Sequence, residues 1–174
     1  MEQYRKSPRA SFIDYDSGAF FITDCAHGRA RHFGEITGST MHLSAVGEFV
    51  DGQLRRASAL SPGIEVPLHV VMPNHIHAIA CLSPVPGSES ISLNQRAANP
   101  SLRDDPDSPR HIPALSRYVN SLKGSVTKFA RARGIDFAWH GRYHDHMIRS
   151  SRDANNISEY IANNVARWEK DCFF

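Results

Sequence analysis

Two short apolar runs separated by a turn pair constrain the fold more than any other feature of the sequence. Residues 66–72 and 75–82 are rich in β-branched and other apolar side chains, and Pro73 and Asn74 between them are turn-forming residues. Each run is too short for a buried helix and has the length of a strand. We therefore predict two antiparallel strands joined as a β-hairpin.

The other predicted elements alternate between strand and helix. They are a strand at 19–23, a helix at 43–57, an amphipathic helix at 115–130 that Gly134 ends, a strand within 137–148 and a final helix that Ser151 or Asp153 caps. A β-hairpin that alternates with helices is typical of an α+β layer fold. The sequence therefore predicts an antiparallel sheet packed with helices.

Length and composition favour one domain. A chain of 174 residues with 41% hydrophobic residues can bury a single core. Residues 1–18 are polar and are expected to form an N-terminal arm. Residues 84–111 are rich in Pro, Ser, Asn and Asp, which predicts a flexible insertion within a domain at 19–174.

Targeting and cysteine patterns point to the cytoplasm. The apolar runs fall short of the ~20 residues that cross a bilayer, and the first residues lack the apolar core of a signal peptide. The three cysteines, Cys25, Cys81 and Cys172, are far apart in the sequence and form no C-x-x-C pair. Neither a disulfide framework nor a thiolate zinc site is expected.

Two histidine pairs are candidate metal ligands. His75 and His77 are two residues apart on a predicted strand, so both side chains project to one face and can hold one divalent ion. The alternative is a pair of unrelated strand histidines. His144 and His146 have the same spacing on a later predicted strand. They can complete the site or compete for the ion, or they can lie on an exposed strand face.

The final predicted helix combines a phenol with an amide. Its apolar stripe consists of Ile157, Tyr160, Ile161, Asn164, Val165 and Trp168. Tyr160 on such a stripe is ordinarily a core residue with its hydroxyl at the edge. Asn164 is four residues later and shares its face. A buried Asn needs a partner, which a metal or a bound phosphate would supply.

Positive charge is concentrated in the second half of the chain. The net charge is only +2. The basic residues considered for DNA binding are Arg117, Lys123, Lys128, Arg131, Arg142, Arg149 and Arg152. They form either a solvated helix face with ordinary surface charge or a phosphate-binding surface.

Several other enzyme classes are excluded by pattern. The histidine-triad nucleotide hydrolases need a third histidine at the next alternate position, where this chain has Ile79. The H-E-x-x-H metalloprotease motif, the Walker A loop and the G-x-G-x-x-G fingerprint are absent from the sequence.

The ordered set of motifs resembles the single-tyrosine HUH transposases, in particular the REP-associated tyrosine transposase branch of bacteria. The motifs are Gly18-Ala-Phe-Phe-Ile-Thr, His32-Phe-Gly-Glu-Ile, Met72-Pro-Asn-His-Ile-His, Ser121-Leu-Lys-Gly, Tyr143-His-Asp-His-Met-Ile-Arg, Tyr160-Ile-Ala-Asn-Asn and Arg167-Trp-Glu-Lys-Asp. The resemblance covers most of the chain outside the insertion. It implies the ferredoxin-like HUH endonuclease fold in a single domain.

The resemblance also implies a mechanism. Tyr160 would be the nucleophile, His75, His77 and Asn164 the ligands of Mg²⁺ or Mn²⁺, and His146 a supporting residue of the site. The implied reaction is metal-dependent attack of the tyrosine on a DNA phosphodiester near a hairpin, with a covalent phosphotyrosine intermediate that allows rejoining. The expected partner is single-stranded or hairpin DNA. A homodimer is compatible with the resemblance, whereas a membrane or a small organic cofactor is not expected.

Two other functions are compatible with the same residues. The fold and its basic surface can bind DNA or RNA hairpins without cleaving them, or the protein can be an ordinary metal-dependent nuclease. A covalent protein–oligonucleotide product distinguishes the strand transferase from both, because neither binding nor hydrolysis forms one.

Overall fold

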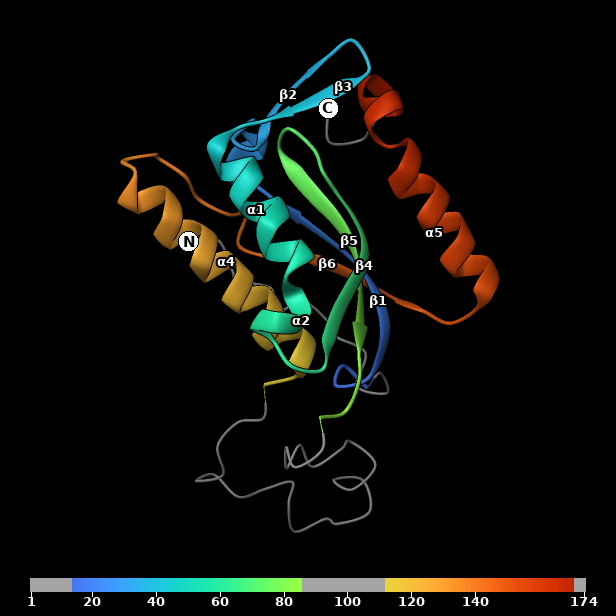
Figure 1. Ribbon diagram of the computed structural model, residues 1–174. Helices are drawn as coiled ribbons and strands as arrows, with labels where there is room; N and C mark the ends of the chain where they lie inside the picture. The colour runs from blue at the N-terminus through green and yellow to red at the C-terminus, as the bar shows by residue number, and fades with distance from the viewer. Residues whose placement is uncertain (1–13, 86–111, 171–174) are drawn as a thin grey trace, which may run out of the picture.

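The computed structural model describes residues 14–85 and 112–170 (Figure 1). Its strands are β1 (Gly18–Cys25), β2 (Gly34–Thr37), β3 (Thr40–Leu43), β4 (Ile64–Val71), β5 (His75–Leu82) and β6 (His144–Ile148). Its helices are α1 (Ala45–Arg55), α2 (Ala57–Leu60), α4 (Ala114–Ala132) and α5 (Ser151–Asn163), with 3-10 turns η1 (His27–Arg29) and η3 (Val165–Lys170). No helix in these ranges is long and apolar enough to cross a membrane.

The main sheet has four strands in the order β4-β5-β1-β6, and all neighbours are antiparallel. Helices α1 and α2 connect β1 to β4, and α4 follows β5 and leads to β6, so the main-sheet strands and their connecting helices follow the ferredoxin-like β-α-β-β-α-β order. The predicted α+β class with an antiparallel sheet is therefore confirmed. The small β2–β3 hairpin is inserted between β1 and α1.

The predicted β4–β5 hairpin is also confirmed. Met72 donates its backbone N–H to the carbonyl of His75 at 2.8 Å, which closes the turn at Pro73 and Asn74. Pro67 lies on β4, an edge strand, within the register shift between Glu65 and Leu68. An edge strand tolerates a proline at an irregular position because no ladder hydrogen bond is lost there.

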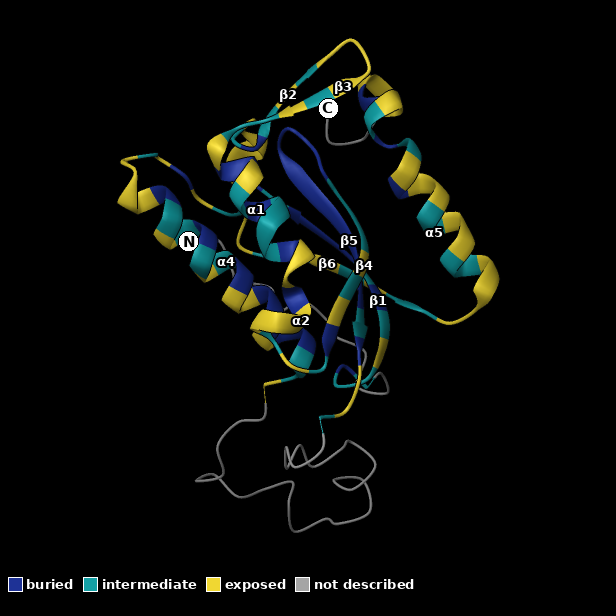
Figure 2. Cartoon of the chain, in the orientation of Figure 1, coloured by how far each residue is buried: buried dark blue, intermediate teal, exposed yellow. Residues whose placement is uncertain are grey.

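The two faces of the sheet have different roles. Helices α1 and α4 cover one face, and α5 lies on the other side of the sheet (Figure 1). The helix-covered face contributes Phe20, Ile22, Ile76 and Ala78 to the main core, and all four are almost completely buried. Strand β5 is mostly buried on both faces (Figure 2). Its alternate residues therefore form part of the core and part of the surface that faces α5.

The β2–β3 hairpin is not predicted by the sequence, and one residue was assigned wrongly. Leu43 has the correct spacing for the first helix but ends β3 instead. Helix α1 begins two residues later, after Ser44, whose hydroxyl accepts a hydrogen bond from the backbone N–H of Gly47 at 3.1 Å. A Cβ on Gly47 would lie 2.0 Å from the carbonyl oxygen of Phe33, so the close approach of the helix requires glycine there.

The later helices agree with prediction except at one boundary. Helix α4 ends near Gly134, which has a φ of +66° and follows the helix as a left-handed residue. Helix α5 is capped by Ser150, not by Ser151 or Asp153. The hydroxyl of Ser150 accepts from the backbone N–H of Asp153 at 3.2 Å. Serine at this position satisfies one of the free N–H groups of the first turn.

The predicted arm and insertion fall mostly outside the described residues. Of the arm at 1–18, only residues 14–18 are described, and of the insertion at 84–111, only residues 84 and 85. Both assignments remain predictions.

Candidate active site

His75 and His77 lie on the face of β5 that is opposite to the main core. Their Nε2 atoms are 3.0 Å apart, and the exposed fractions of the two residues are 0% and 1%. Strand alternation explains the arrangement, because Ile76 between them points into the core. The predicted pairing of the two imidazoles is therefore present in the structure.

Each imidazole is held through its other nitrogen. Nδ1 of His75 lies 2.8 Å from Oδ1 of Asn74, and Nδ1 of His77 lies 2.8 Å from Oγ1 of Thr23. An amide oxygen can only accept, so Nδ1 of His75 carries the proton and Nε2 presents a lone pair. These partners fix the rings so that both Nε2 atoms face one point. Neither Thr23 nor Asn74 was identified from the sequence.

Burial keeps His77 neutral. Loss of solvation, followed by the neighbouring His75, lowers the pKa of His77 from 6.5 to about 3. A neutral imidazole is the form that binds a cation or accepts a hydrogen bond. His77 can therefore act as an acceptor throughout the physiological pH range.

Tyr160 reaches the histidine pair from α5. Its hydroxyl oxygen is 3.2 Å from Nε2 of His77, and its ring packs edge-on against Phe21 with centroids 6.1 Å apart. Phe21 in turn stacks on the His77 ring at 5.2 Å. Tyr160 is 38% exposed, so it is not the core residue that a tyrosine on an apolar stripe ordinarily is. A phenol that is both positioned and accessible can attack a bound substrate.

Asn164 is the buried residue that follows α5. In sequence it is four residues after Tyr160, which contacts His77, and four before Trp168, whose ring stacks on His75 at 6.1 Å. It is 2% exposed, and its side-chain oxygen has no hydrogen-bond partner in the described structure. A buried acceptor without a partner is costly, and a cation would satisfy it.

The side chains present fit a divalent ion. The donor set is two imidazole nitrogens and one amide oxygen, from His75, His77 and Asn164. Among residues 14–85 and 112–170, no group of three His, Cys, Asp or Glu side chains could hold a metal by itself. The unpartnered oxygen of Asn164 is therefore the observation that supports a third protein ligand.

The second histidine pair does not join the first. Nε2 of His146 lies 2.9 Å from Oδ2 of Asp153, and this interaction ties β6 to the first turn of α5. The hydrogen bond from His146 is the main cause of a lowered pKa for the Asp153 carboxyl. In the sheet register His146 lies opposite Phe21, whose ring contacts His77 and Tyr160. The expectation that His146 supports the site stays a prediction, and the contact with Asp153 is the one through which it would act. His144 is exposed and lies opposite Thr23 in the sheet register.

Lys123 differs from the other basic residues. Its ammonium donates to Oδ1 of Asp24 at 3.0 Å and to the carbonyl of His140 at 2.8 Å, and it lies over the Trp139 ring. Asp24 is 1% exposed. Lys123 is therefore paired with a buried carboxylate although it also lines the groove described below, and its assignment as a phosphate contact stays a prediction.

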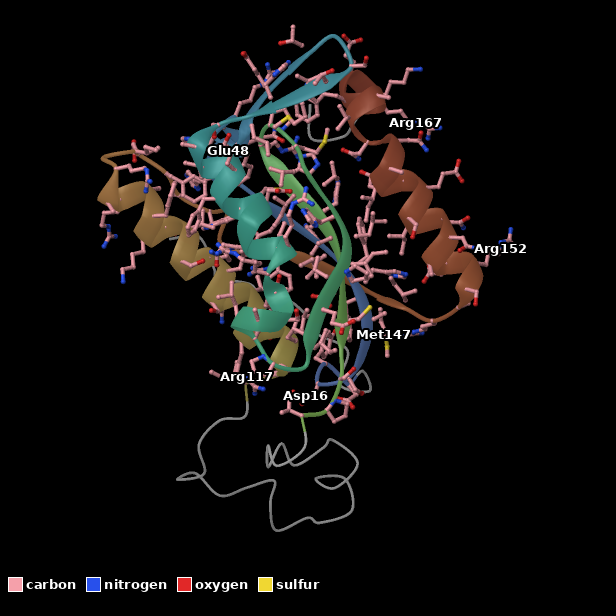
Figure 3. The ribbon with its side chains drawn as sticks, in the orientation of Figure 1. Asp16, Glu48, Arg117, Met147, Arg152 and Arg167 are labelled. Atoms are coloured by element: carbon pink, nitrogen blue, oxygen red, sulfur yellow. The ribbon has the colours of Figure 1, made fainter. Side chains whose placement is uncertain are left out.

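The remaining predicted DNA contacts lie on two sides of the molecule. Lys128 and Arg131 line a groove of about 870 Å³ between α4 and residues 137–141, together with Phe137 and Trp139. Arg117 lies at the beginning of α4, and Arg152 lies at the beginning of α5, on the opposite side of the sheet (Figure 3). Arg142 is half-buried and Arg149 is exposed beside β6.

The pH dependence of stability tests whether Asp24 is a buried carboxyl, as its contact with Lys123 in the structure indicates. Burial raises its pKa from 3.8 to about 6, despite the opposing effect of Lys123. The folded state therefore binds this proton more tightly than the unfolded state, and the resulting stabilisation is lost as pH rises through about 6. Relative to Asp24→Asn, we expect the free energy of unfolding of the wild type to fall by about 2 kcal/mol between about pH 4 and pH 7. Urea unfolding of both proteins across this range measures the difference, and parallel curves would contradict the assignment.

Comparison with known proteins agrees with the fold. A solved structure of the REP-associated tyrosine transposase bound to a REP hairpin superposes with a TM-score of 0.58 at 18% identity, over 94% of this chain and 74% of that one. The chain therefore has the fold of a REP-associated tyrosine transposase, as the sequence motifs indicated.

A relative shows the family directly. An uncharacterized protein of Haemophilus influenzae is 30% identical over 171 residues, which cover 97% of this chain and 92% of that protein. The chain belongs to the same family as this Haemophilus influenzae protein. No family model matches the sequence.

Proposed function

We propose that this protein is a transposase-type enzyme that cleaves and rejoins single-stranded DNA near a hairpin, with Tyr160 as the nucleophile. The observation that carries the proposal is the 3.2 Å approach of the Tyr160 hydroxyl to Nε2 of His77, one of two buried imidazoles that face the same point. Burial of two histidines costs solvation free energy, and such a pair beside an accessible phenol is typical of a functional site. Phosphodiester cleavage is the reaction that these groups support best.

The reaction is a transesterification. The phenol oxygen of Tyr160 forms a bond to the scissile phosphorus, one phosphorus–oxygen bond of the DNA breaks, and the departing nucleoside oxygen leaves as a hydroxyl after gaining a proton. The number of phosphodiester bonds is unchanged, so a hydroxyl at another DNA end can attack the phosphotyrosine and restore the strand. The proton that the phenol loses goes to solvent water, because a pKa of about 3 makes His77 too weak a base to hold it, and the leaving oxygen takes its proton from solvent.

His75, His77 and Asn164 would hold the divalent ion, Mg²⁺ or Mn²⁺. When bound, such an ion supplies charge stabilisation for a phosphate that would otherwise repel a nucleophile. Thr23 and Asn74 support the site by fixing the two rings through Nδ1. Phe21 and the face of α5 limit the positions that the phenol can take.

The groove between α4 and residues 137–141 supports binding of hairpin DNA. It combines the cations of Lys128 and Arg131 with the partly buried ring of Trp139, behind which Phe137 is buried in the core. Cations contact phosphates and aromatic side chains stack with bases, a combination typical of nucleic-acid surfaces. The structurally similar transposase is itself described in complex with a REP hairpin.

The salt dependence of binding tests the groove. If Lys128 and Arg131 each neutralise one phosphate, then Lys128→Ala and Arg131→Ala should each reduce the slope of log affinity against log salt concentration by about 1. Arg56→Ala is the matched control, because Arg56 is exposed after α1 and does not line the groove, so its loss should leave the slope unchanged. Fluorescence anisotropy with a labelled hairpin measures all three. Wild-type slopes for Lys128→Ala and Arg131→Ala would show that the groove is an ordinary solvated face.

The proposed activity is tested by incubating the protein with a panel of labelled single-stranded hairpins and Mg²⁺ or Mn²⁺. A protein–oligonucleotide band that survives denaturing electrophoresis is the expected result. Hairpin binding without cleavage would instead identify a binding module, and cleavage without a covalent band would identify a hydrolytic nuclease.

A further inference from the structure

Each imidazole of the histidine pair is stacked against a second aromatic ring. Phe21 stacks on His77 with ring centroids 5.2 Å apart and an angle of 25° between the ring planes. Trp168 stacks on His75 with centroids 6.1 Å apart and an angle of 27°. Phe21 also contacts the nucleophile, as described above, whereas Trp168 has no role in the proposed chemistry so far. The stacking of Trp168 on a candidate metal ligand therefore needs its own explanation.

Trp168 anchors the end of the chain segment that carries the candidate nucleophile. This segment continues from α5 through η3 toward the β2–β3 hairpin (Figure 1). Within residues 151–170, three side chains are buried, those of Ile161, Asn164 and Trp168. The backbone N–H of Arg167 donates to the carbonyl of Asn164 at 3.1 Å, so the turn that joins Asn164 to Trp168 is hydrogen-bonded. The position of the indole therefore influences the position of the Asn164 amide.

The indole is also held by the chain segment that follows η1. The guanidinium of Arg31 lies over the Trp168 ring, 5.8 Å from its centroid, in the arrangement of a cation–π contact. Trp168 is 6% exposed, and His75 beneath it is 0% exposed. Contacts with β5 on one hand and with Arg31 on the other restrict the orientation of the ring. Trp168 thus joins three segments of the chain at the histidine pair.

We propose that Trp168 is a positioning residue of the metal site, which holds the His75 imidazole and the Asn164 amide in the orientation that binds the ion. The inference rests on the proposed function, since it assigns a role within the proposed metal site. Asn74 fixes Nδ1 of His75 by one hydrogen bond at 2.8 Å. A single hydrogen bond tolerates tilting of the imidazole plane, whereas a ring stacked on the imidazole restricts that tilt. The hydrogen bond and the stacking contact therefore restrict different motions of His75, and Trp168 acts through His75 and Asn164, not on the substrate.

The test compares Trp168→Leu with Trp168→Phe. Both variants keep an apolar side chain at the buried position, but only phenylalanine keeps a flat ring that can stack on His75. We expect Trp168→Leu to lower the affinity for Mn²⁺ by about 10–100-fold, the usual effect of losing a residue that orients a metal ligand. Trp168→Phe should keep the affinity within about five-fold of the wild type, because the aromatic contact is retained. Calorimetry of metal-free protein with Mn²⁺ measures these affinities.

Trp139→Phe is the matched control. The chain has two tryptophans, and the Trp139 ring contacts Lys123 beside the groove at α4 and not the histidine pair. This variant should leave the Mn²⁺ affinity unchanged. Wild-type affinity in a folded Trp168→Leu protein, or an equal loss of affinity in Trp139→Phe, would overturn the inference.

A second measurement needs neither metal nor DNA. The ring resonances of His75, recorded by NMR in histidine-labelled protein, should shift in Trp168→Phe and shift further in Trp168→Leu, because the ring current of the indole is reduced and then lost. They should not shift in Trp139→Phe. If Trp168→Leu does not fold, unshifted His75 resonances in Trp168→Phe would still overturn the inference. These outcomes are separate from failure of the proposed function, which is absence of a covalent product from the wild-type protein with any hairpin.

Discussion

Replacement of Tyr160 by phenylalanine is expected to eliminate the covalent protein–DNA product completely while leaving hairpin affinity within about two-fold of the wild type. The substitution removes only the hydroxyl that lies 3.2 Å from His77. The ring remains, and with it the edge-on contact with Phe21 at 6.1 Å, so the helix should keep its position. Because no other group supplies the attacking oxygen, the loss should be total. Denaturing electrophoresis and anisotropy measure the two quantities.

Tyr118→Phe is the matched control for this experiment. Tyr118 is buried in the main core, and burial raises the pKa of its hydroxyl to about 12. Its hydroxyl has no hydrogen-bond partner in the described structure, so removing it should neither unfold the protein nor reduce the product. A nucleotide located by mass spectrometry on Tyr118 or Tyr143, or a product that persists in Tyr160→Phe, would refute the central residue of the mechanism.

His75→Ala and His77→Ala are expected to abolish strand cleavage, also with hairpin binding largely preserved. Each change removes one of two facing Nε2 atoms, and a site with so few protein ligands should lose most of its affinity for Mn²⁺. Calorimetry measures the metal affinity, and the covalent product measures the activity. Metal binding that is unchanged in both variants would show that the pair is not a metal site.

Two further substitutions distinguish the proposed metal ligands from the residues that position them. Thr23→Val keeps the shape of the side chain but removes the hydroxyl bound to Nδ1 of His77, so we expect a loss of about 10–100-fold in metal affinity or activity. His146→Ala is the contrasting control, because its ring is bonded to Asp153 and not to the pair. It should leave metal affinity unchanged.

The parts of the site that follow from local periodicity could be predicted from the sequence. The alternation of β5 places His75 and His77 on one face, and the four-residue spacing of Tyr160 and Asn164 places them on one face of α5. Only the resemblance to a transposase family indicates that these two segments form one site. Neither spacing alone indicates that the tyrosine meets the histidines.

The parts that depend on strand register and distant pairing could not be predicted. Thr23 meets His77 because β1 and β5 pair in one particular register, which a single strand does not reveal. Lys123 pairs with Asp24 across ninety-nine positions of sequence, so it resembled a surface cation in a basic helix. The β2–β3 hairpin was missed because its strands have four residues each and little apolar alternation.

The unequal burial of β5 and α5 has a consequence for motion. His75 and His77 belong to a strand that is hydrogen-bonded on both sides, and Ile76 between them is part of the core. In α5, by contrast, Ile161 is the only buried residue among the thirteen from Ser151 to Asn163. Local opening costs least where few apolar contacts must be broken. In the proposed reaction the histidine pair would therefore be the fixed part, and we expect α5, which carries Tyr160, to be the part that opens locally at the lower cost in free energy.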